Sequence, residues 1–312
     1  MTDKYEAVVV GGGAAGLSAA LVLGRARRRT LVVDAGEPRN APAAHLQGYL
    51  TRDGVPPAEF LALGREEVAR YGVELVRDRA LDVIRIGSGD FRVTLESGRT
   101  AYARRLVLAT GLADELPTVP GVAERFGRDV LHCPYCHGWE VRDEAFGVLA
   151  GSATGVHQAL MVSQWSKDVT LFLHEVAEEE LSPDDRRRLA AAGVAVVPGE
   201  VAALVVEEDR LTGVRLTDGS SHARSVLFVA PRAVPRNDLF ERLGAELRET
   251  PFGTYPVVDE TGLTSVPGVW AAGNAAAFAE QVVNAASAGY RAAATLNGEL
   301  LFADLDAVPR RD

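Results

Sequence analysis

The chain has 312 residues, and 47% of them are hydrophobic, which is enough to bury a substantial core. Its formal net charge of −10 argues against nucleic acid or an anionic membrane surface as a partner, because both attract basic proteins. No stretch approaches the roughly 18 apolar residues that a membrane span needs, and the first residues do not resemble a secretory signal peptide. We therefore expect a cytoplasmic protein without nucleic-acid or membrane partners.

The first third of the chain predicts a strand, a glycine-rich turn, a helix and a second strand. Apolar runs and helical spacing place these elements over residues 5–10, 17–28 and 30–34, with the turn at 11–16. The patterns that follow predict a helix over 59–71 and short strands near 74–76, 82–86, 91–95 and 106–109. A strand–helix–strand unit opened by glycines is typical of a nucleotide-binding domain.

A second unit of the same kind is predicted beyond residues 117–121, where two prolines and a glycine break the pattern. Its strand, helix and strand are expected over 146–150, 155–165 and 169–174. The remaining predicted elements are a charged helix over 184–192, strands over 194–197, 201–206 and 211–217, a proline-rich return at 231–235 and a helix over 281–296.

The two units are nested rather than consecutive. The predicted inserted lobe covers residues 118–235 and carries both cysteines, whereas residues 1–117 and 236–312 form one discontinuous domain. The predicted fold class is α/β, with two Rossmann-like dinucleotide-binding domains.

The first glycine turn has the features of a dinucleotide site. Gly11, Gly13 and Gly16 match G-x-G-x-x-G directly after a strand and before a helix, and Asp34 ends the next strand. The glycines permit a tight turn, a close approach to a pyrophosphate and close helix–strand packing, while the helix N-terminus offers free N–H groups. The Asp34 carboxylate suits a ribose hydroxyl. The alternative is a turn with a purely structural role.

Later segments resemble the FAD-contact motifs of flavoproteins with two dinucleotide domains. These segments are the Thr110–Gly111 strand end, Gly273–Asn274 and the helix start at Gln281–Val282. That family carries Asp where this chain has Asn274, and an amide still hydrogen-bonds a ribityl hydroxyl. The resemblance implies that residues 1–117 and 236–312 bind FAD. The candidate contacts are Gly11, Gly13, Ala14, Ala15, Gly16, Asp34, Ala35, Arg39, Asn40, Ala80, Thr110, Gly111, Gly273, Asn274, Gln281 and Val282.

The two cysteines, Cys133 and Cys136, lie within the segment HCPYCHGWE at residues 132–140. This spacing allows a disulfide on one helical turn, and Pro134 suits that turn because it has no N–H to leave unpaired. Thiols at a helix N-terminus beside imidazoles favour thiol–disulfide exchange. Zinc needs four ligands, and the sequence has no second C-x-x-C or spaced histidine pair, so we expect no metal. Half of a zinc site and an inert thiol pair are the alternatives.

The order of these motifs resembles the low-molecular-weight thioredoxin reductase family across nearly the whole chain. Within that family, CPYCHGWE differs from the Cys-Ala-Thr-Cys-Asp-Gly of the reductases. It resembles the dithiol oxidases that close the disulfides of gliotoxin, holomycin and romidepsin, and so do residues 39–42, His45 and residues 48–50. The resemblance also implies a homodimer.

The resemblance assigns roles to three residues of this segment. It implies that Cys136 lies against C4a of the flavin and that Cys133 exchanges with the substrate. His137 takes the position of the acid/base Asp of the reductases, and an imidazole titrates near neutral pH. The alternative for His137 is a structural helix histidine, and for His132 and Glu140 a structural role is at least as plausible.

The second nucleotide turn departs from an NADPH site. Ala150 and Ser152 stand at its first two glycine positions, where a Cβ at Ser152 crowds a pyrophosphate. Glu175 follows the next strand, where it would repel a 2′-phosphate, and residues 178–180 add three more acids. The arginines at 186–188 read as a solvated helix face. We expect this domain to keep its fold without its nucleotide.

These observations predict an FAD-dependent dithiol oxidase that closes a disulfide in a small natural-product dithiol, with O2 as acceptor and H2O2 as product. An NADPH-dependent thioredoxin reductase is one alternative. A ferredoxin-dependent reductase is another, although an acidic chain attracts an acidic partner poorly. A flavin-bearing redox sensor without turnover is the non-enzymatic alternative.

Overall fold

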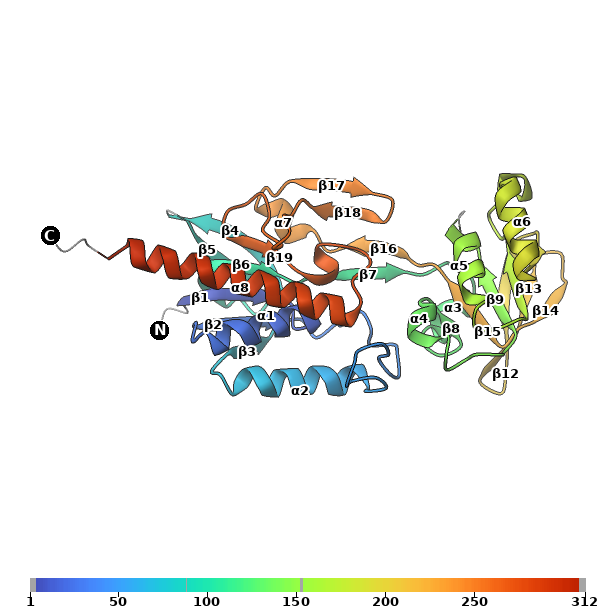
Figure 1. Ribbon diagram of the computed structural model, residues 1–312, viewed down its shortest axis with the longest axis horizontal. Helices are drawn as coiled ribbons and strands as arrows, with labels where there is room; N and C mark the ends of the chain where they lie inside the picture. Colours follow the sequence, from blue (N-terminus) through green and yellow to red (C-terminus); the bar gives the residue numbers. More distant parts are fainter. Residues whose placement is uncertain (1–3, 88, 152–153, 309–312) are drawn as a thin grey trace. The chain divides into compact units, whose positions relative to one another are not determined.

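The computed structural model describes residues 4–87, 89–151 and 154–308, which divide into two compact units (Figure 1). Unit 1 consists of Met1–Ala41, Pro57–Ala113 and Ala233–Asp312. Unit 2 consists of Pro42–Pro56 and Asp114–Arg232. The fold is that of two nested α/β nucleotide-binding units, as the sequence predicts.

Residues 42–56 belong with unit 2, whereas the prediction placed them in the first domain. One close backbone contact joins the start of this segment to the rest of unit 2. A Cβ at Gly127, where φ is +85°, would lie 2.3 Å from the carbonyl oxygen of Pro42, so glycine permits the approach.

Unit 1 is built on a seven-stranded sheet. In spatial order the strands are β3 (Glu74–Arg77), β2 (Thr30–Asp34), β1 (Lys4–Val10), β6 (Thr100–Leu108), β5 (Asp90–Leu95) and β4 (Ala80–Ile86), and β19 (Val269–Ala271) also pairs with β6. β1 runs parallel to β2 and β6, whereas β5 is antiparallel to its neighbours. Successive residues of β1 enter the hydrophobic clusters on opposite faces of the sheet, which explains its unbroken apolar run.

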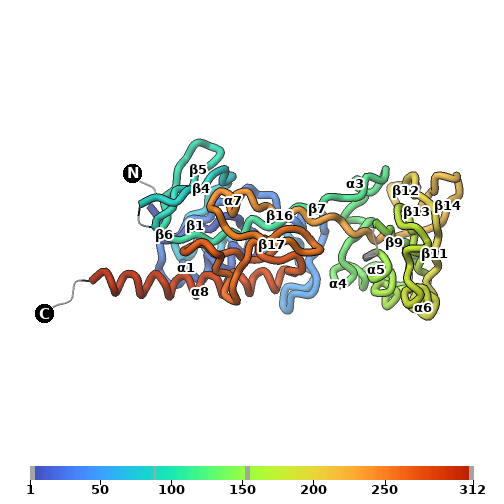
Figure 2. Tube along the Cα trace, turned by 90° about the horizontal axis from the view of Figure 1, so that it is seen from above, coloured from blue at the N-terminus to red at the C-terminus, as the bar shows by residue number. Residues whose placement is uncertain are grey.

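Helices cover one face of this sheet. They are α1 (Ala14–Arg25), α2 (Pro57–Ala69) and α8 (Val282–Asp306). α8 lies along α1 (Figure 2), where a Cβ at Gly289 would come within 1.9 Å of the Ala15 carbonyl oxygen. The other face carries α7 (Asp238–Arg242) and the hairpin of β17 (Leu247–Thr250) and β18 (Gly253–Pro256). No helix in the described part of the chain is long and apolar enough to cross a membrane.

Unit 2 has a five-stranded parallel sheet. Its order is β11 (Ala195–Val197), β10 (Val169–Phe172), β9 (Phe146–Leu149), β15 (Val226–Val229) and β8 (Val130–Leu131). One face packs against α5 (Thr154–Val162) and α6 (Pro183–Ala192), and the other against an antiparallel sheet of β12 (Val201–Glu207), β13 (Arg210–Leu216) and β14 (Ser221–Ala223). The remaining helical segments are α3 (Val122–Arg125), α4 (Pro134–His137) and η1 (Glu178–Glu180).

The two chain crossings between the units are not irregular hinges. β7 (Leu112–Glu115) and β16 (Arg232–Pro235) pair with each other in a two-stranded sheet. Arg232 also forms an ion pair with Glu115. The prolines therefore predict where the chain crosses between the units, but they do not predict the strands β7 and β16 at these crossings.

Candidate functional site

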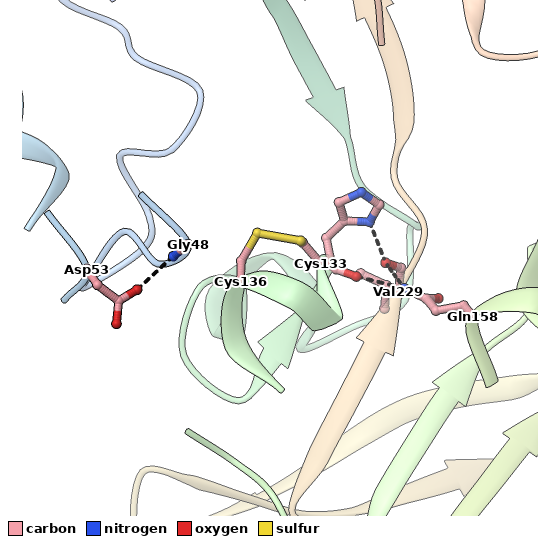
Figure 3. The surroundings of a disulfide bond; sticks show 7 residues. Gly48, Asp53, Cys133, Cys136, Gln158 and Val229 are labelled. Carbon is pink, nitrogen blue, oxygen red and sulfur yellow. Dashed lines mark hydrogen bonds between the residues drawn. A yellow bond between two sulfur atoms is a disulfide. The ribbon is translucent and has the colours of Figure 1, made fainter. Parts of the chain in front are cut away.

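The two cysteines form a disulfide at the start of α4. Their Cα atoms are 5.2 Å apart. Cys133 is the N-cap of the helix in an extended conformation, and Pro134 occupies its first turn, where a missing N–H has no cost. The sequence spacing thus produces a disulfide that spans a single helical turn, in the half-buried segment shown in Figure 3.

The imidazole of His132 is held in one tautomer by the carbonyl of Val229. His132 Nδ1 lies 3.1 Å from the Val229 oxygen, and because a carbonyl only accepts, Nδ1 carries the hydrogen. The lone pair of the neutral ring is therefore on Nε2. Gln158 of α5 donates from Nε2 to the carbonyls of Val229 and His132, at 3.2 and 2.8 Å (Figure 3). No sequence pattern predicts this role of Gln158.

His137 lies in a different environment at the end of α4. Neither ring nitrogen has a hydrogen-bond partner of acceptable geometry among the described residues, and both nitrogens are buried. Burial lowers the pKa of His137 below its ordinary value, against the opposing influence of the Cys133 backbone and the Glu140 carboxylate. The ring is therefore mainly neutral at pH 7 and able to accept a proton.

The first glycine turn in unit 1 has the tight geometry that its motif predicts. A Cβ at Gly11, where φ is +107°, would lie 2.2 Å from the Ala109 carbonyl oxygen. A Cβ at Gly16 would lie 1.8 Å from the carbonyl oxygen of Gly11. At Gly13 nothing lies within 4 Å of an added Cβ, so open space adjoins the N-terminus of α1. This arrangement fits a pyrophosphate that approaches the backbone at Gly13.

Asp34 is the acid at the end of β2. Its Oδ1 accepts a hydrogen bond from the N–H of Gly12 at 3.0 Å, so the carboxylate lies directly beside the glycine turn. The carbonyl of Asp34 accepts from the N–H of Asp78 at 3.0 Å, which brings the segment before Ala80 to the same edge of the sheet. The end of β2 and the start of β4 are thus neighbours.

The later candidate segments also lie in unit 1. Gly273 meets the start of α1, since its Cβ would come within 2.9 Å of the Ala15 Cβ. Thr110 Oγ1 donates to the carbonyl of Arg236 at 3.1 Å, and the Arg236 N–H donates to the carbonyl of Gly111 at 3.2 Å. The structure therefore brings the late Gly–Asn segment to the glycine turn and ties the Thr–Gly segment to the returning chain.

The amide nitrogen of Asn274 donates two hydrogen bonds within its own loop. Nδ2 lies 2.8 Å from the Phe278 carbonyl oxygen and 3.2 Å from that of Ala277. Its Oδ1 accepts from Arg39 at 3.5 Å, and the Arg39 guanidinium lies 5.8 Å from the centroid of the Phe278 ring. The oxygen of Asn274, rather than its nitrogen, is thus the atom oriented away from the loop backbone.

Glu280 is a residue that the sequence analysis did not select. It precedes Gln281, the N-cap of α8, and its Oε2 is buried without a hydrogen-bond partner in the described residues. Burial raises the pKa of Glu280, with Arg291 acting in the opposite direction. Its position next to Gln281 was the available signal.

The second nucleotide turn, in unit 2, is packed differently from the first. A Cβ at Gly155 would lie 2.7 Å from both Cα and Cβ of Ala150, so the alanine stands against the helix start. Ser152 lies outside the described residues. Where the next strand ends, His174 Nδ1 accepts the N–H of Val201 at 3.0 Å, and Glu175 is 72% exposed.

The three arginines of α6 are paired with acids of their own segment. Arg186 bonds to Glu178, and Arg187 and Arg188 lie near Asp184. This pairing agrees with the predicted solvated helix face. In the described part of the chain, no group of three or more His, Cys, Asp or Glu residues is placed to hold a metal ion.

A family model described as pyridine nucleotide-disulphide oxidoreductase matches residues 5–289. The chain belongs to this family. Membership identifies the protein as an oxidoreductase and implies a flavin cofactor.

Relatives match the chain over nearly its full length. Thioredoxin reductase sirT of Leptosphaeria maculans is 35% identical and aligns with 97% of this chain and 96% of its own. Thioredoxin reductase tcpT of Claviceps purpurea is 33% identical, with 98% and 97% covered. The crystal structure of HlmI is 51% identical with a TM-score of 0.92, and the match covers 97% of this chain and 94% of that one. The predicted thioredoxin reductase-like fold is therefore confirmed.

Proposed function

We propose that the protein is an FAD-dependent dithiol oxidase. It oxidises a small dithiol to an intramolecular disulfide and uses O2 as the acceptor, with H2O2 as product. The observation that carries this proposal is a redox-capable disulfide, Cys133–Cys136, on a unit whose nucleotide-binding features are altered. The resemblance of CPYCHGWE to the dithiol oxidases supports the same assignment.

Unit 1 fits FAD. The residues that would hold it are the turn at Gly11–Gly16, Asp34 at the end of β2, the Thr110–Gly111 segment, and Gly273–Asn274 with Gln281 at the start of α8. The tight approaches at Gly11 and Gly16, with open space at Gly13, give the turn the shape that a pyrophosphate needs. When bound, FAD supplies the two-electron chemistry that returns the enzyme dithiol to the disulfide, with O2 as the final acceptor.

The cysteines carry the exchange with substrate. One substrate thiolate attacks the sulfur of Cys133, the Cys133–Cys136 bond breaks, and Cys136 leaves as a thiolate. The second substrate thiolate then attacks the first substrate sulfur, and Cys133 leaves as a thiolate. The substrate has lost two electrons and two protons, and the enzyme has gained a dithiol.

Imidazoles beside the disulfide handle the protons of this exchange. His137 is neutral at pH 7 because burial lowers its pKa, which is the protonation state that a proton acceptor needs. The tautomer of His132 places the ring lone pair on Nε2, on the residue next to Cys133. Both imidazoles lie within the segment that carries the exchange.

Features of unit 2 argue against a nicotinamide route for the electrons. The imidazole nitrogen of His174 is used by the N–H of Val201, and the exposed Glu175 would repel a 2′-phosphate. The arginines of α6 are already paired with acids. These features support an electron source other than a nicotinamide, and the proposal assigns that role to the reduced dithiol.

Oxygen uptake with a panel of small dithiols tests the proposal. We expect wild-type protein loaded with FAD to consume O2 and release H2O2 without NADPH. Cys133→Ser and Cys136→Ser should each lower the rate by at least about 100-fold, because each removes one sulfur of the exchanging pair. Uptake that persists in either variant would refute the mechanism.

The relatives sirT and tcpT are named as thioredoxin reductases, which favours a second candidate, an NADPH- or ferredoxin-dependent thioredoxin reductase. Anaerobic mixing with NADPH separates the two. Rapid bleaching of the flavin by NADPH would support the reductase, whereas bleaching by a dithiol alone supports the oxidase. Reduction by a ferredoxin, with none by dithiols, would point to the ferredoxin-dependent enzyme.

A further inference from the structure

Two of the exposed large apolar side chains of unit 2 belong to the segment that carries the disulfide. Among its described residues, four such side chains are exposed: Leu50 by 86%, Tyr135 by 70%, Trp139 by 65% and Val206 by 42%. Tyr135 lies between the two cysteines in sequence, and Trp139 follows α4 directly. Exposed aromatic side chains on such a short segment are a sign of a binding surface rather than of a core.

Neighbouring side chains pack against both aromatic rings. Tyr135 meets Trp165 edge to face, with ring centroids 5.7 Å apart. A Cβ at Gly138 would lie 2.8 Å from the ring of Trp165, so the backbone of the segment rests on this indole. The guanidinium of Arg142 lies 4.2 Å from the Trp139 ring centroid, and it donates to the Trp139 carbonyl at 2.7 Å. The rings are thus positioned in advance, which lowers the entropic cost of binding.

Leu50 stands on an ordered loop of the same unit. The loop is closed by backbone hydrogen bonds of Leu46 with Val55 and Gly54, and by one from the Gly48 N–H to Asp53 at 2.7 Å. Figure 3 draws Gly48 and Asp53 among the surroundings of the disulfide, on the side of Cys136. The loop therefore lies on the Cys136 side of the disulfide, and it exposes Leu50 to solvent.

We propose that Tyr135 and Trp139 bind the apolar body of the dithiol whose sulfur attacks Cys133. We call these two residues the aromatic platform. This inference rests on the proposed function and names the class of its substrate: a small, non-anionic dithiol with an apolar body. The side chains that touch this body set specificity, whereas the cysteines carry the exchange.

The size of the platform argues for a small molecule over a protein. A buried aromatic side chain contributes about 150–250 Å², so the platform offers a few hundred Å² at most. A stable protein interface needs about 800 Å² from each partner. The exposed acids Glu140, Asp143 and Glu144 adjoin Trp139 in the chain and disfavour an anionic substrate.

Two model dithiols with different bodies test the platform. The first, 1,2-bis(mercaptomethyl)benzene, is flat and apolar, and the second, dithiothreitol, is polar and acyclic. We expect Tyr135→Ala and Trp139→Ala each to lower kcat/KM for the aromatic dithiol at least tenfold, because buried apolar contact is lost. The value for dithiothreitol should change less than threefold. Val206→Ala, an exposed apolar site on β12, should change neither value.

An equal decrease in kcat/KM with both dithiols, or no decrease with either, would contradict the proposal, because neither result would depend on the apolar body of the substrate. A loss confined to a protein disulfide substrate would assign the surface to a protein partner instead. Failure of the proposed function shows separately, as no turnover of any dithiol by wild type. In that case, calorimetric titration with 1,4-dihydro-2,3-benzodithiine decides: binding weakened at least tenfold by Trp139→Ala supports the platform, and unchanged or absent binding rejects it.

Discussion

Two histidines in one short motif have received opposite surroundings. Nδ1 of His132 is hydrogen-bonded to the Val229 carbonyl, whereas both ring nitrogens of His137 are buried and have no hydrogen-bond partner among the described residues. The sequence places both imidazoles beside the cysteines, and only the family resemblance favours His137 as the acid/base residue. Side-chain burial and the partner on β15 depend on contacts between distant segments, so no local pattern reveals them.

Gln158 is the residue that links α5 to this site, and its removal should be costly. The side chain is 8% exposed and donates to two carbonyls, those of Val229 and His132. Gln158→Leu keeps a similar volume but leaves the His132 carbonyl without this donor, whereas the Val229 carbonyl keeps the hydrogen bond from His132 Nδ1. We expect the free energy of unfolding to fall by about 1–3 kcal/mol, the usual cost of an unsatisfied buried polar group.

Denaturant unfolding measures this effect, and Gln164→Leu is the matched control. Gln164 follows the same helix but is exposed, and its amide donates only to the Met161 carbonyl at 3.2 Å. The control should change stability by less than about 0.5 kcal/mol. Equal unfolding midpoints for the two variants would contradict the role assigned to Gln158.

At the scale of elements, the strand–helix–strand units were predictable because glycine turns and apolar runs are local signals. Other elements were missed for physical reasons. β16 lies in a segment whose prolines suggest a hinge, although edge pairing with β7 tolerates them. The predicted end of the last helix at residue 296 was too early. The helix continues through Gly298, although glycine has a low helix propensity, because Leu300 is fully buried in the core of unit 1.

The connection of α3 to the β12–β13 hairpin depends on a cluster of charges. Arg125 is 5% exposed as a whole residue, and it bonds to Asp129 and Asp209. Burial alone would raise the pKa of Asp129, but the hydrogen bonds from Arg125 and from the Leu211 N–H outweigh this and hold its pKa below the ordinary value. The cluster therefore joins two elements that are distant in sequence.

Arg125→Met should reduce stability and alter its dependence on pH. Hydrogen bonds to charged groups contribute about 1.5–3 kcal/mol, so a loss of this order is expected at pH 7. Because the folded pKa of Asp129 is lowered, its contribution is present above the unfolded pKa of about 4 and is lost as pH falls through the folded value. The variant should therefore lose less stability than wild type between pH 5 and the acid midpoint, in unfolding measured across about pH 2–7.

Arg128→Met is the control for this prediction. Arg128 bonds to the same Asp209, but half of its side chain is exposed, and ion pairs in solvent contribute little. A pH profile of Arg125→Met that runs parallel to that of wild type would show that the cluster does not carry the acid dependence.

At the scale of the whole molecule, the C-terminal half of α8 presents an unusual surface. In both views its last turns extend beyond the strands of unit 1 (Figures 1 and 2). Leu301 and Leu305 follow helical spacing on one side and are 47% and 57% exposed, and the neighbouring Phe302 is 67% exposed. Val308, just beyond the end of the helix, is 62% exposed. An apolar stripe of this kind is stabilised when a partner covers it.

A second copy of the chain is the partner that we expect, since the family resemblance implies a homodimer and a self-complementary helix face is a common two-fold contact. Sedimentation velocity should give a species of two 33.2 kDa chains for wild type. The double variant Phe302→Glu/Leu305→Glu should sediment as a monomer at the same concentration, because burying two carboxylates in an apolar contact is unfavourable. Leu81→Glu, on the exposed side of β4, should leave the dimer intact. A monomeric wild type, or a double variant that remains dimeric, would exclude this face as the contact.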